Sequence, residues 1–267
     1  VSEEIVKGIK KLKLEALIVL GGDGTLHIAH ELALKGVPII GVPKTIDNDI
    51  GGTEVTFGFD TALNIATEAI DRLHTTAESH HRAMVLELMG RDAGFIALQA
   101  GICGGADVIL IPEIPFKFES IMAKIRERAE KGRKFSILAV SEGAKSQDGM
   151  QVFSREGDDI YVPRLGGIGQ VVGEYIEKQG FESRVTVLGH LQRGGTPTAF
   201  DRSLATRFGA AAVRLAARSG FDRMVALQSG RVTDISLVDA TAIPKRVKLE
   251  DDSVITARNV GISFGDE

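Results

Sequence analysis

Short apolar segments alternate with helical patterns along most of the chain, and this alternation limits the fold more than any other feature. Glycine-rich or polar loops follow most of these segments. Strands that are apolar on both faces are typical of a parallel sheet that helices cover on both sides. The strands that the pattern predicts are 16–20, 37–42, 83–88, 108–111, 135–140 and 184–188. The sequence therefore predicts an α/β fold.

Helical patterns fill the intervals between these strands. Ser2 caps the first predicted helix, and Ile5, Ile9 and Leu12 recur on one of its faces. The most polar stretch, 145–160, is predicted to be a surface loop. The remaining predicted helices end at Ala33 or span 62–73, 95–103, 121–129, 168–178 and 203–218.

Composition excludes several classes of protein. Apolar residues make up 43% of the chain, and 32 basic against 36 acidic residues give a formal charge of −4, which is typical of a globular protein. There is no basic excess to favour nucleic-acid binding. No apolar run reaches the roughly 18 residues that a membrane span needs. The single cysteine, Cys103, excludes a disulfide framework or multi-cysteine metal site and favours a reducing, cytoplasmic location.

The loop after strand 16–20 reads Gly21-Gly22-Asp23-Gly24-Thr25 and opens a helix. In open α/β sheets, ligands bind beyond the carboxyl ends of the strands. Glycines let the backbone approach a ligand closely, and free N–H groups at a helix start suit phosphate. Because a carboxylate repels bare phosphate, Asp23 indicates a Mg²⁺ ion between the two. A tight turn capped by Asp23 is the alternative interpretation.

The loop after strand 37–42 is densely polar and contains Lys44, Thr45, Asp47, Asn48 and Asp49. Two carboxylates two residues apart, beside a hydroxyl and an amide, allow one to act as a general base while the other supports a metal. A carboxylate base suits phosphoryl transfer to a hydroxyl group. An Asx-rich turn without catalytic function is the alternative.

Two later loops add a cation and a carboxylate. Arg91 lies in the loop 89–94 at a helix start, where it could stabilise charge on a phosphoryl group or form a surface pair with Asp92. Glu142 follows strand 135–140 and, as a hydrogen-bond acceptor, suits a sugar hydroxyl.

The loop after strand 184–188 adds His190 and Arg193, which together suit a dianionic phosphate. Arg82 and Arg184 are additional basic candidates. In the alternative interpretation, each of these side chains is structural or solvated.

Five motifs occur in one order along the chain: GGDGT at 21–25, PKTIDNDIGGTE at 43–54, ESHHR at 78–82, MGRDAG at 89–94 and VLGHLQRGG at 187–195. In this combination the chain resembles the bacterial-type 6-phosphofructokinases, and the resemblance continues to GISFG near the end. It implies two Rossmann-like parallel-sheet sandwich domains with the active site in the cleft between them. By the same resemblance, residues 1–58 and 193–250 bind the donor, ATP with Mg²⁺, and residues 59–192 and 251–267 bind fructose 6-phosphate.

The resemblance also implies the reaction and the roles of its residues. A phosphoryl group passes from ATP to the 1-hydroxyl of fructose 6-phosphate, which is the committed step of glycolysis. Asp47 is the base for that hydroxyl, and Asp23 holds Mg²⁺ with Asp49 close by. Thr45 binds the phosphoryl group in transit and Arg91 stabilises its transition state. The implied contacts to the sugar and its 6-phosphate are Met89, Gly90, Glu142, His190 and Arg193.

Self-association follows from the same resemblance. In the family, the residues that match Arg82 and Arg184 reach the 6-phosphate from the neighbouring subunit. The protein is therefore expected to form a dimer or a tetramer.

Regulation by an effector nucleotide is also a family property. Asp107, Lys131 and Arg133 match effector-binding positions, whereas His74 stands where an arginine is common. We therefore expect weak or absent control by ADP and phosphoenolpyruvate.

The choice of donor depends on two positions, Gly24 and Lys44. ATP-using members usually have glycine at both, whereas pyrophosphate-using members usually have aspartate and lysine. Gly24 leaves room for the α-phosphate of a nucleotide, so ATP is the predicted donor. A pyrophosphate-dependent phosphotransferase acting on fructose 6-phosphate is the alternative.

The family begins with a glycine-rich loop on its first strand, and no such loop precedes Val1 in this sequence. We therefore expect that part of the donor site is missing and that this chain alone is inactive or unstable.

Two other functions compete with this interpretation. One is a NAD or lipid kinase that shares only GGDGT, and the other is a non-catalytic subunit that binds sugar phosphate and regulates a partner. The later loops argue against the first, and the intact Asp23, Asp47 and Arg91 argue against the second.

Overall fold

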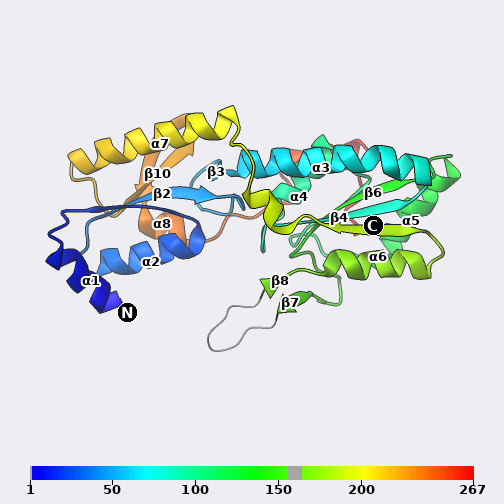
Figure 1. The fold of residues 1–267 in the computed structure, drawn as a ribbon, viewed down its shortest axis with the longest axis horizontal. Coiled ribbons are helices and arrows are strands. Elements are labelled where there is room, and N and C mark those ends of the chain that lie inside the picture. The colour runs from blue at the N-terminus through cyan, green and yellow to red at the C-terminus, as the bar shows by residue number, and fades with distance from the viewer. Residues whose placement is uncertain (1, 156–163) are drawn as a thin grey trace. The chain divides into compact units, whose positions relative to one another are not determined.

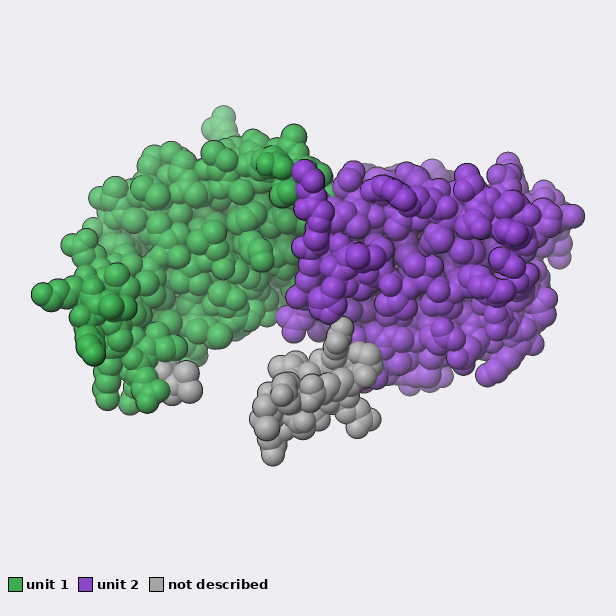
Figure 2. Space-filling model, in the orientation of Figure 1, with its two compact units in different colours: residues 1–60, 197–245 green, residues 61–196, 246–267 purple. Residues whose placement is uncertain are grey.

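The computed structural model describes residues 2–155 and 164–267, and the chain forms two compact units (Figure 1, Figure 2). Unit 1 comprises residues 1–60 and 197–245, and unit 2 comprises residues 61–196 and 246–267. From the sequence, we expect domain boundaries at 58, 192 and 250. Which substrate each unit binds stays a prediction. None of the described helices has the length and apolarity that crossing a bilayer requires.

Unit 1 is built on a sheet in which β1, β2, β10 and β11 follow one another. β1 (Leu17–Gly21) and β10 (Arg223–Gln228) both run parallel to β2 (Ile39–Thr45). β11 (Arg231–Ser236) is antiparallel to β10 and adds an edge strand that the sequence pattern does not predict. The turn between them, Ser229-Gly230, has φ values of 49° and 72°, as a two-residue hairpin turn requires.

Helices cover both faces of this sheet. The helices of unit 1 are α1 (Ser2–Lys11), α2 (Asp23–Leu34), α7 (Ala199–Ala217) and α8 (Leu237–Ala242), and a short strand β3 (Phe57–Gly58) pairs with the end of β2. On one face, Leu26 of α2 packs in a cluster with Ile39, and on the other, Phe208 of α7 packs in a cluster with Ile40. Adjacent residues of β2 thus enter different cores, as expected for a strand buried on both faces.

The buried face of α1 differs from the predicted one. Val6 and Ile9 pack against the cluster on the α2 side, whereas Ile5 is 39% exposed and Leu12, beyond the end of the helix, is 70% exposed. Of the three residues predicted to share an apolar face, only Ile9 contacts the core.

Unit 2 contains a sheet of four parallel strands in the order β5-β6-β4-β9. Its strands are β4 (Ala83–Leu88), β5 (Val108–Leu110), β6 (Ser136–Ser141) and β9 (Ser183–Val187). Its helices are α3 (Phe59–His80), which starts in unit 1, α4 (Phe95–Cys103), α5 (Phe118–Glu130), α6 (Ile168–Lys178) and α9 (Asp252–Asn259). The predicted strand 83–88 and the predicted helices 95–103 and 168–178 match these boundaries.

The predicted surface loop 145–160 is partly structured. β7 (Phe153–Arg155) pairs with β8 (Arg164–Leu165), and the N–H of Gln147 donates to the carbonyl of Phe116 at 2.8 Å. The described part of the stretch is therefore anchored to unit 2, while 156–160 lies outside the described residues.

An inner strand of the unit 2 sheet, β4, positions the start of α6 through a buried carboxylate. Glu87 is 3% exposed and accepts the N–H groups of Gly167 and Gly169 at 3.0 and 2.7 Å. A negative charge is favoured at a helix start. Since the strands are parallel, the loops that follow β4, β6 and β9 all leave the sheet at its carboxyl edge.

Candidate active site

The loops 21–25 and 43–49 leave the sheet of unit 1 side by side, because β1 and β2 are parallel neighbours. A Cβ atom on Gly22 would lie 3.1 Å from the Cβ of Thr45, so the two loops are in van der Waals contact. The structure thus brings together the two segments on which the predicted chemistry depends.

The glycine-rich loop runs directly into α2. A Cβ on Gly21 would lie 2.3 Å from the Cβ of Thr25, so only glycine fits there. Asp23 lies in the first turn, and its side chain, 29% exposed, has Oδ1 3.2 Å from Nδ1 of His27. Sequence patterns do not single out His27, although its spacing of four residues from Asp23 is the signal for this contact. A Cβ on Gly24 would meet no heavy atom within 4 Å, so the loop is open at that position.

Thr45 and Asp47 form a closed local turn. Oγ1 of Thr45 donates to Oδ2 of Asp47 at 3.2 Å and accepts the backbone N–H of Asp47 at 3.2 Å. Asp47 is 8% exposed, whereas Lys44 beside this turn is exposed. A shielded carboxylate whose direction is fixed in this way is suited to accept a proton from a bound hydroxyl.

The residues after this turn are held by a distant lysine. Asn48 has a φ of 56°, and its Oδ1 accepts the N–H of Thr56 at 3.1 Å and Nζ of Lys245 at 3.0 Å. Nζ of Lys245 also donates to the carbonyls of Thr53 and Glu54 at 3.1 and 2.8 Å. Nothing in the sequence pattern links Lys245 to this loop, because the contact exists only in the folded unit.

Asp23 and Asp49 are the predicted Mg²⁺ ligands. Asp23 is partly exposed beside the open position at Gly24, and Asp49 is 9% exposed. Across residues 2–155 and 164–267, no group of three or more His, Cys, Asp or Glu side chains is arranged to hold a metal. Mg²⁺ at phosphate sites takes one or two carboxylates and completes its shell with phosphate oxygens and water. The carboxylates of Asp23 and Asp49 are of the chemistry that such an ion takes, and their role as its ligands stays a prediction.

The loop 89–94, after β4, is held by side chains from three other parts of unit 2. Three of its N–H groups donate to them: Met89 to Oε1 of Gln192 (2.8 Å), Arg91 to Oε1 of Glu142 (3.1 Å) and Gly94 to Oε1 of Glu113 (3.0 Å). Gly90 and Arg91 have φ values of 145° and 53°, a conformation that favours glycine at the first of them. Within the loop, the N–H of Ala93 also donates to the carbonyl of Gly90 at 3.0 Å. The loop is therefore fixed mainly by bonds to distant side chains, with one local turn of its own.

Two of these acceptors are carboxylates, and the sequence motifs predict a functional role for only one of them. Glu142 was expected at the sugar, and it also holds the backbone of Arg91. Glu113 is not revealed by any motif. Burial raises the pKa of the Glu113 carboxyl, although the N–H groups of Gly94 and Val247 oppose this.

His190 and Arg193 lie on a short 3₁₀ helix, η1 (Gly189–Arg193), directly after β9. In a 3₁₀ helix, residues three apart lie above one another, so these two side chains project on the same side. Both are exposed, whereas Gln192 between them is buried. The pair is thus available to an anion from solvent.

Arg82 and Arg184 lie at the opposite, amino-terminal end of the same sheet. Arg82 directly precedes β4, and Arg184 is the second residue of the neighbouring strand β9. Each places an Nη2 atom 2.8 Å from Oε1 of Glu182. The hydrogen bond from Arg82 lowers the pKa of Glu182. Neither arginine is close to the loops of its own unit that carry the other predicted site residues.

The phosphofructokinase family model matches residues 1–216 of the chain. The chain belongs to the phosphofructokinase family. The ATP-dependent 6-phosphofructokinase of Chloroflexus aurantiacus is 56% identical over 263 residues, which are 98% of this chain and 72% of that protein. ATP-dependent 6-phosphofructokinase 2 of Clostridium perfringens is 52% identical over 269 residues, which are 100% of this chain and 74% of that protein.

Solved phosphofructokinase structures share the fold. The enzyme from Saccharomyces cerevisiae superposes with a TM-score of 0.73 at 32% identity, covering 88% of this chain and 33% of that one. A pyrophosphate-dependent phosphofructokinase from Marinobacter aquaeolei gives a TM-score of 0.81 at 20% identity, covering 98% of this chain and 71% of that one. The predicted α/β fold with parallel-sheet domains is confirmed.

One position matched to the family's effector site is already engaged inside unit 2. Asp107 pairs with Nη1 of Arg128 at 2.6 Å and accepts the N–H of Ile137 at 2.9 Å. Burial raises the pKa of Asp107, although both of these partners act to lower it. Nε2 of His74 lies 2.7 Å from the carbonyl oxygen of Gly104. Weak effector control of this phosphofructokinase stays a prediction.

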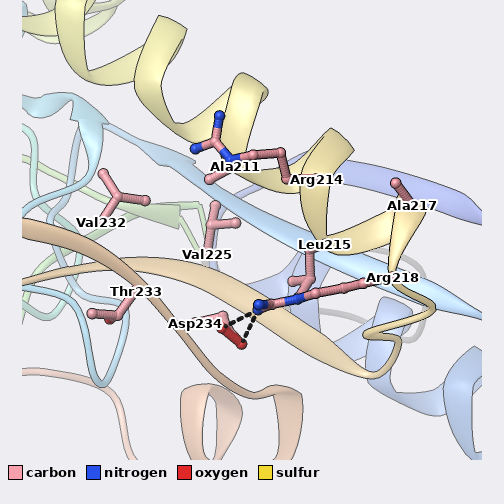
Figure 3. A pocket seen from close by; sticks show the side chains of 9 residues that line it. All are labelled: Ala211, Arg214, Leu215, Ala217, Arg218, Val225, Val232, Thr233 and Asp234. Carbon is pink, nitrogen blue, oxygen red and sulfur yellow. Dashed lines mark hydrogen bonds and ion pairs between the residues drawn. The ribbon is translucent and has the colours of Figure 1, made fainter.

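Unit 1 also contains a cavity of about 730 Å³ between α7 and the β10–β11 hairpin (Figure 3). This cavity lies apart from the loops 21–25 and 43–49. Leu215, Val225 and Val232 line it with apolar surface. At one side, Arg218 forms an ion pair of 3.0 Å with Asp234 (Figure 3). None of the phosphofructokinase site residues predicted from the sequence lines this cavity.

Proposed function

We propose that the protein transfers the γ-phosphoryl group of ATP to the 1-hydroxyl of fructose 6-phosphate. The observation that carries the proposal is the contact between loops 21–25 and 43–49, which sets a glycine-rich helix start beside the oriented carboxylate of Asp47. Relatives at 52–56% identity that are named ATP-dependent 6-phosphofructokinases support it.

Unit 1 supplies the donor site and the base in this proposal. N–H groups of the loop 21–25 bind the donor phosphates. The hydroxyl oxygen bonds to the γ-phosphorus while the bond from that phosphorus to ADP breaks, and Asp47, oriented by Thr45, accepts the hydroxyl proton. Mg²⁺, which Asp23 and Asp49 would hold, supplies positive charge that offsets the charge on the phosphates.

Unit 2 supplies the sugar site. The positive charge of Arg91 stabilises the phosphoryl group in transit. His190 and Arg193, exposed on one side of η1, bind the 6-phosphate. The remaining sugar contacts that we assign are Met89, Gly90 and Glu142.

ATP is the donor that we assign, in preference to pyrophosphate. The open space at Gly24 accommodates the α-phosphate of a nucleotide, which an aspartate there would repel.

We also assign Arg82 and Arg184 to the site of a second subunit. Their place at the amino-terminal end of the unit 2 sheet, away from η1, supports this role. The proposal therefore includes a dimer or a tetramer, in the cytoplasm, as the active form.

The decisive test measures fructose 1,6-bisphosphate formation by the purified full-length protein, with ATP and with pyrophosphate. We expect turnover with ATP to exceed that with pyrophosphate. Asp47→Ser should lower kcat about a thousandfold while the KM for fructose 6-phosphate changes little, because general-base catalysis contributes about 10² to 10⁴ in rate.

Asp71→Ser is the matched control, since Asp71 is an exposed aspartate on α3 outside the proposed site. It should leave both constants unchanged. Faster turnover with pyrophosphate would overturn the donor assignment, and a fully active Asp47→Ser protein would overturn the role of the base.

A further inference from the structure

Gln192 is a buried residue of unit 2 to which the proposed function gives no role. It lies on η1 between His190 and Arg193, the two residues assigned to the 6-phosphate, and is 1% exposed. Its Oε1 accepts the backbone N–H of Met89 at 2.8 Å, across 103 residues of sequence. This bond links the phosphate-binding helix η1 to the loop 89–94.

We propose that Gln192 is a positioning residue that fixes η1 relative to the loop 89–94. The inference rests on the proposed function, because it concerns how the two ends of the sugar phosphate are held. Because Gln192 holds η1 and this loop together, the distance between the groups that bind the 6-phosphate and those near the reacting hydroxyl is fixed.

The pairing of strands explains why a side chain is needed at this point. β9 runs parallel to β4, and the N–H of Leu188 donates to the carbonyl of Glu87 at 3.0 Å. Beyond Leu188 the chain turns into η1, and strand pairing with β4 ends. The bond from Met89 to Gln192 continues the connection between the two chain segments by one further link.

The orientation of the Gln192 amide is fixed by this bond. An oxygen can accept the Met89 N–H, whereas a flipped amide would set its NH₂ group against that N–H, donor against donor. Among the described residues, Nε2 of Gln192 has no hydrogen-bond partner, so of the two amide atoms only Oε1 is hydrogen-bonded. Position 192 therefore requires a side chain that is long enough to bring an acceptor oxygen to the N–H of Met89.

The first test compares Gln192→Met with Gln192→Glu. Methionine fills similar space without an acceptor oxygen, whereas glutamate keeps one. We expect Gln192→Met to lower kcat/KM for fructose 6-phosphate at least about tenfold, because small misplacements of a substrate cost up to about 10² in rate. The KM for ATP should change less than about twofold, and Gln192→Glu should recover most of the loss.

Gln170→Met is the matched control, because Gln170 is exposed on α6 and its amide donates to Glu174. It should behave as the unaltered protein. If Gln192→Met does not fold, Gln192→Asn replaces it, since the shorter amide cannot reach Met89 and the same losses are expected. Unchanged kcat/KM in a folded Gln192 variant without the acceptor, or an equal rise in the KM for ATP, would overturn the proposal.

Amide hydrogen exchange at Met89 tests the link without any substrate. Loss of the acceptor should raise the exchange rate at Met89 at least about tenfold, as expected for an amide that loses its hydrogen bond. If the unaltered protein does not phosphorylate fructose 6-phosphate, the proposed function fails, yet this measurement still decides whether Gln192 fixes the loop. Unchanged exchange at Met89 would show that it does not.

Discussion

The turn 45–47 of unit 1 and the loop 89–94 of unit 2 are held in opposite ways. Thr45 and Asp47 bond to each other across two residues. The N–H groups of the loop 89–94 donate instead to side chains 19, 51 and 103 residues away, those of Glu113, Glu142 and Gln192. One site is a local motif at a strand end, and the other is assembled from the whole unit.

The comparison shows where each half of the proposed site is vulnerable. A local turn keeps its geometry as long as the strand before it is formed. A loop held by distant acceptors loses its geometry when any of those elements shifts. Changes remote from the loop 89–94 should therefore impair sugar use, whereas the turn 45–47 should respond mainly to changes within itself.

Apart from the loss of the base in Asp47→Ser, the largest effect is expected from Gly143→Ala. A Cβ at Gly143 would lie 2.0 Å from the carbonyl oxygen of Arg91, so the loop 89–94 must move. We expect a loss of about 100-fold in kcat/KM for fructose 6-phosphate. Overpacking should also cost about 1–3 kcal/mol in the free energy of unfolding. Steady-state kinetics and urea unfolding measure the two effects.

Gly209→Ala provides the control for this change. Gly209 lies within α7, and a Cβ there would meet no heavy atom within 4 Å. The variant should keep full activity and gain about 0.5–1 kcal/mol in stability, because alanine is the better helix former. Similar losses in both variants would mean that the contact with Arg91 is not the cause.

A smaller effect is expected from Thr45→Val, which removes the hydroxyl from the local turn. The hydroxyl donates to Asp47 and accepts its N–H, so the carboxylate loses the hydrogen bond from Thr45 that orients it. One hydrogen bond contributes about 1 kcal/mol, so kcat should fall about fivefold to tenfold. Thr45→Ser keeps the hydroxyl and should retain most of the activity. If both variants were equally impaired, the methyl group rather than the hydroxyl would be responsible.

Glu113→Gln should alter the pH dependence of stability. Burial raises the pKa of Glu113 in the folded state above its ordinary value of 4.5. The folded protein then binds this proton more tightly than the unfolded one, so stability is lost as the pH rises from about 4.5 through the folded pKa. Glutamine does not titrate, and its oxygen can keep the bonds from Gly94 and Val247.

Urea unfolding of both proteins at a series of pH values measures this difference. The variant should gain stability relative to the unaltered protein as the pH rises. Asp107, whose pKa is raised in the same direction, is present in both and cancels. A difference that stays constant with pH would contradict the assignment to Glu113.

The smallest effect is expected from Glu127→Gln. In the described part of the chain, the Glu127 carboxylate has no connection to the turn 45–47 or the loop 89–94. Nζ of Lys124 lies 3.1 Å from Glu127, Lys131 also pairs with it, and their hydrogen bonds lower its pKa to about 2. Because exposed ion pairs are screened by water and salt, the Tm should change by less than about 2 °C. In about 0.5 M NaCl the change should vanish, and a larger, salt-independent shift would show that the pair is not a simple surface pair.

The sequence alone predicted the elements whose patterns are dense and local. The boundaries of β4, α4 and α6 match their predicted ranges, because each is a continuous apolar or helical run bounded by turn residues. The hairpin of β10 and β11 was missed, although Ser229-Gly230 between two alternating segments is a hairpin signal.

Within the candidate site, the motifs located the loops but not what holds them. Asp23, Thr45, Asp47 and Arg91 stand in recognisable motifs after apolar strands, and parallel pairing of β1 with β2 brings the first three into neighbouring loops. That much follows from the sequence, because a parallel sheet sets the carboxyl ends of its strands along one edge.

Tertiary structure decided which residues support these loops. Lys245 holds Asn48, and Glu113 and Gln192 hold the loop 89–94, each through a bond to a residue distant in the chain. A periodic pattern reports only which face of an element is buried. It cannot report which acceptor will meet a given N–H, because that pairing is set by how strands and helices pack after the chain has folded.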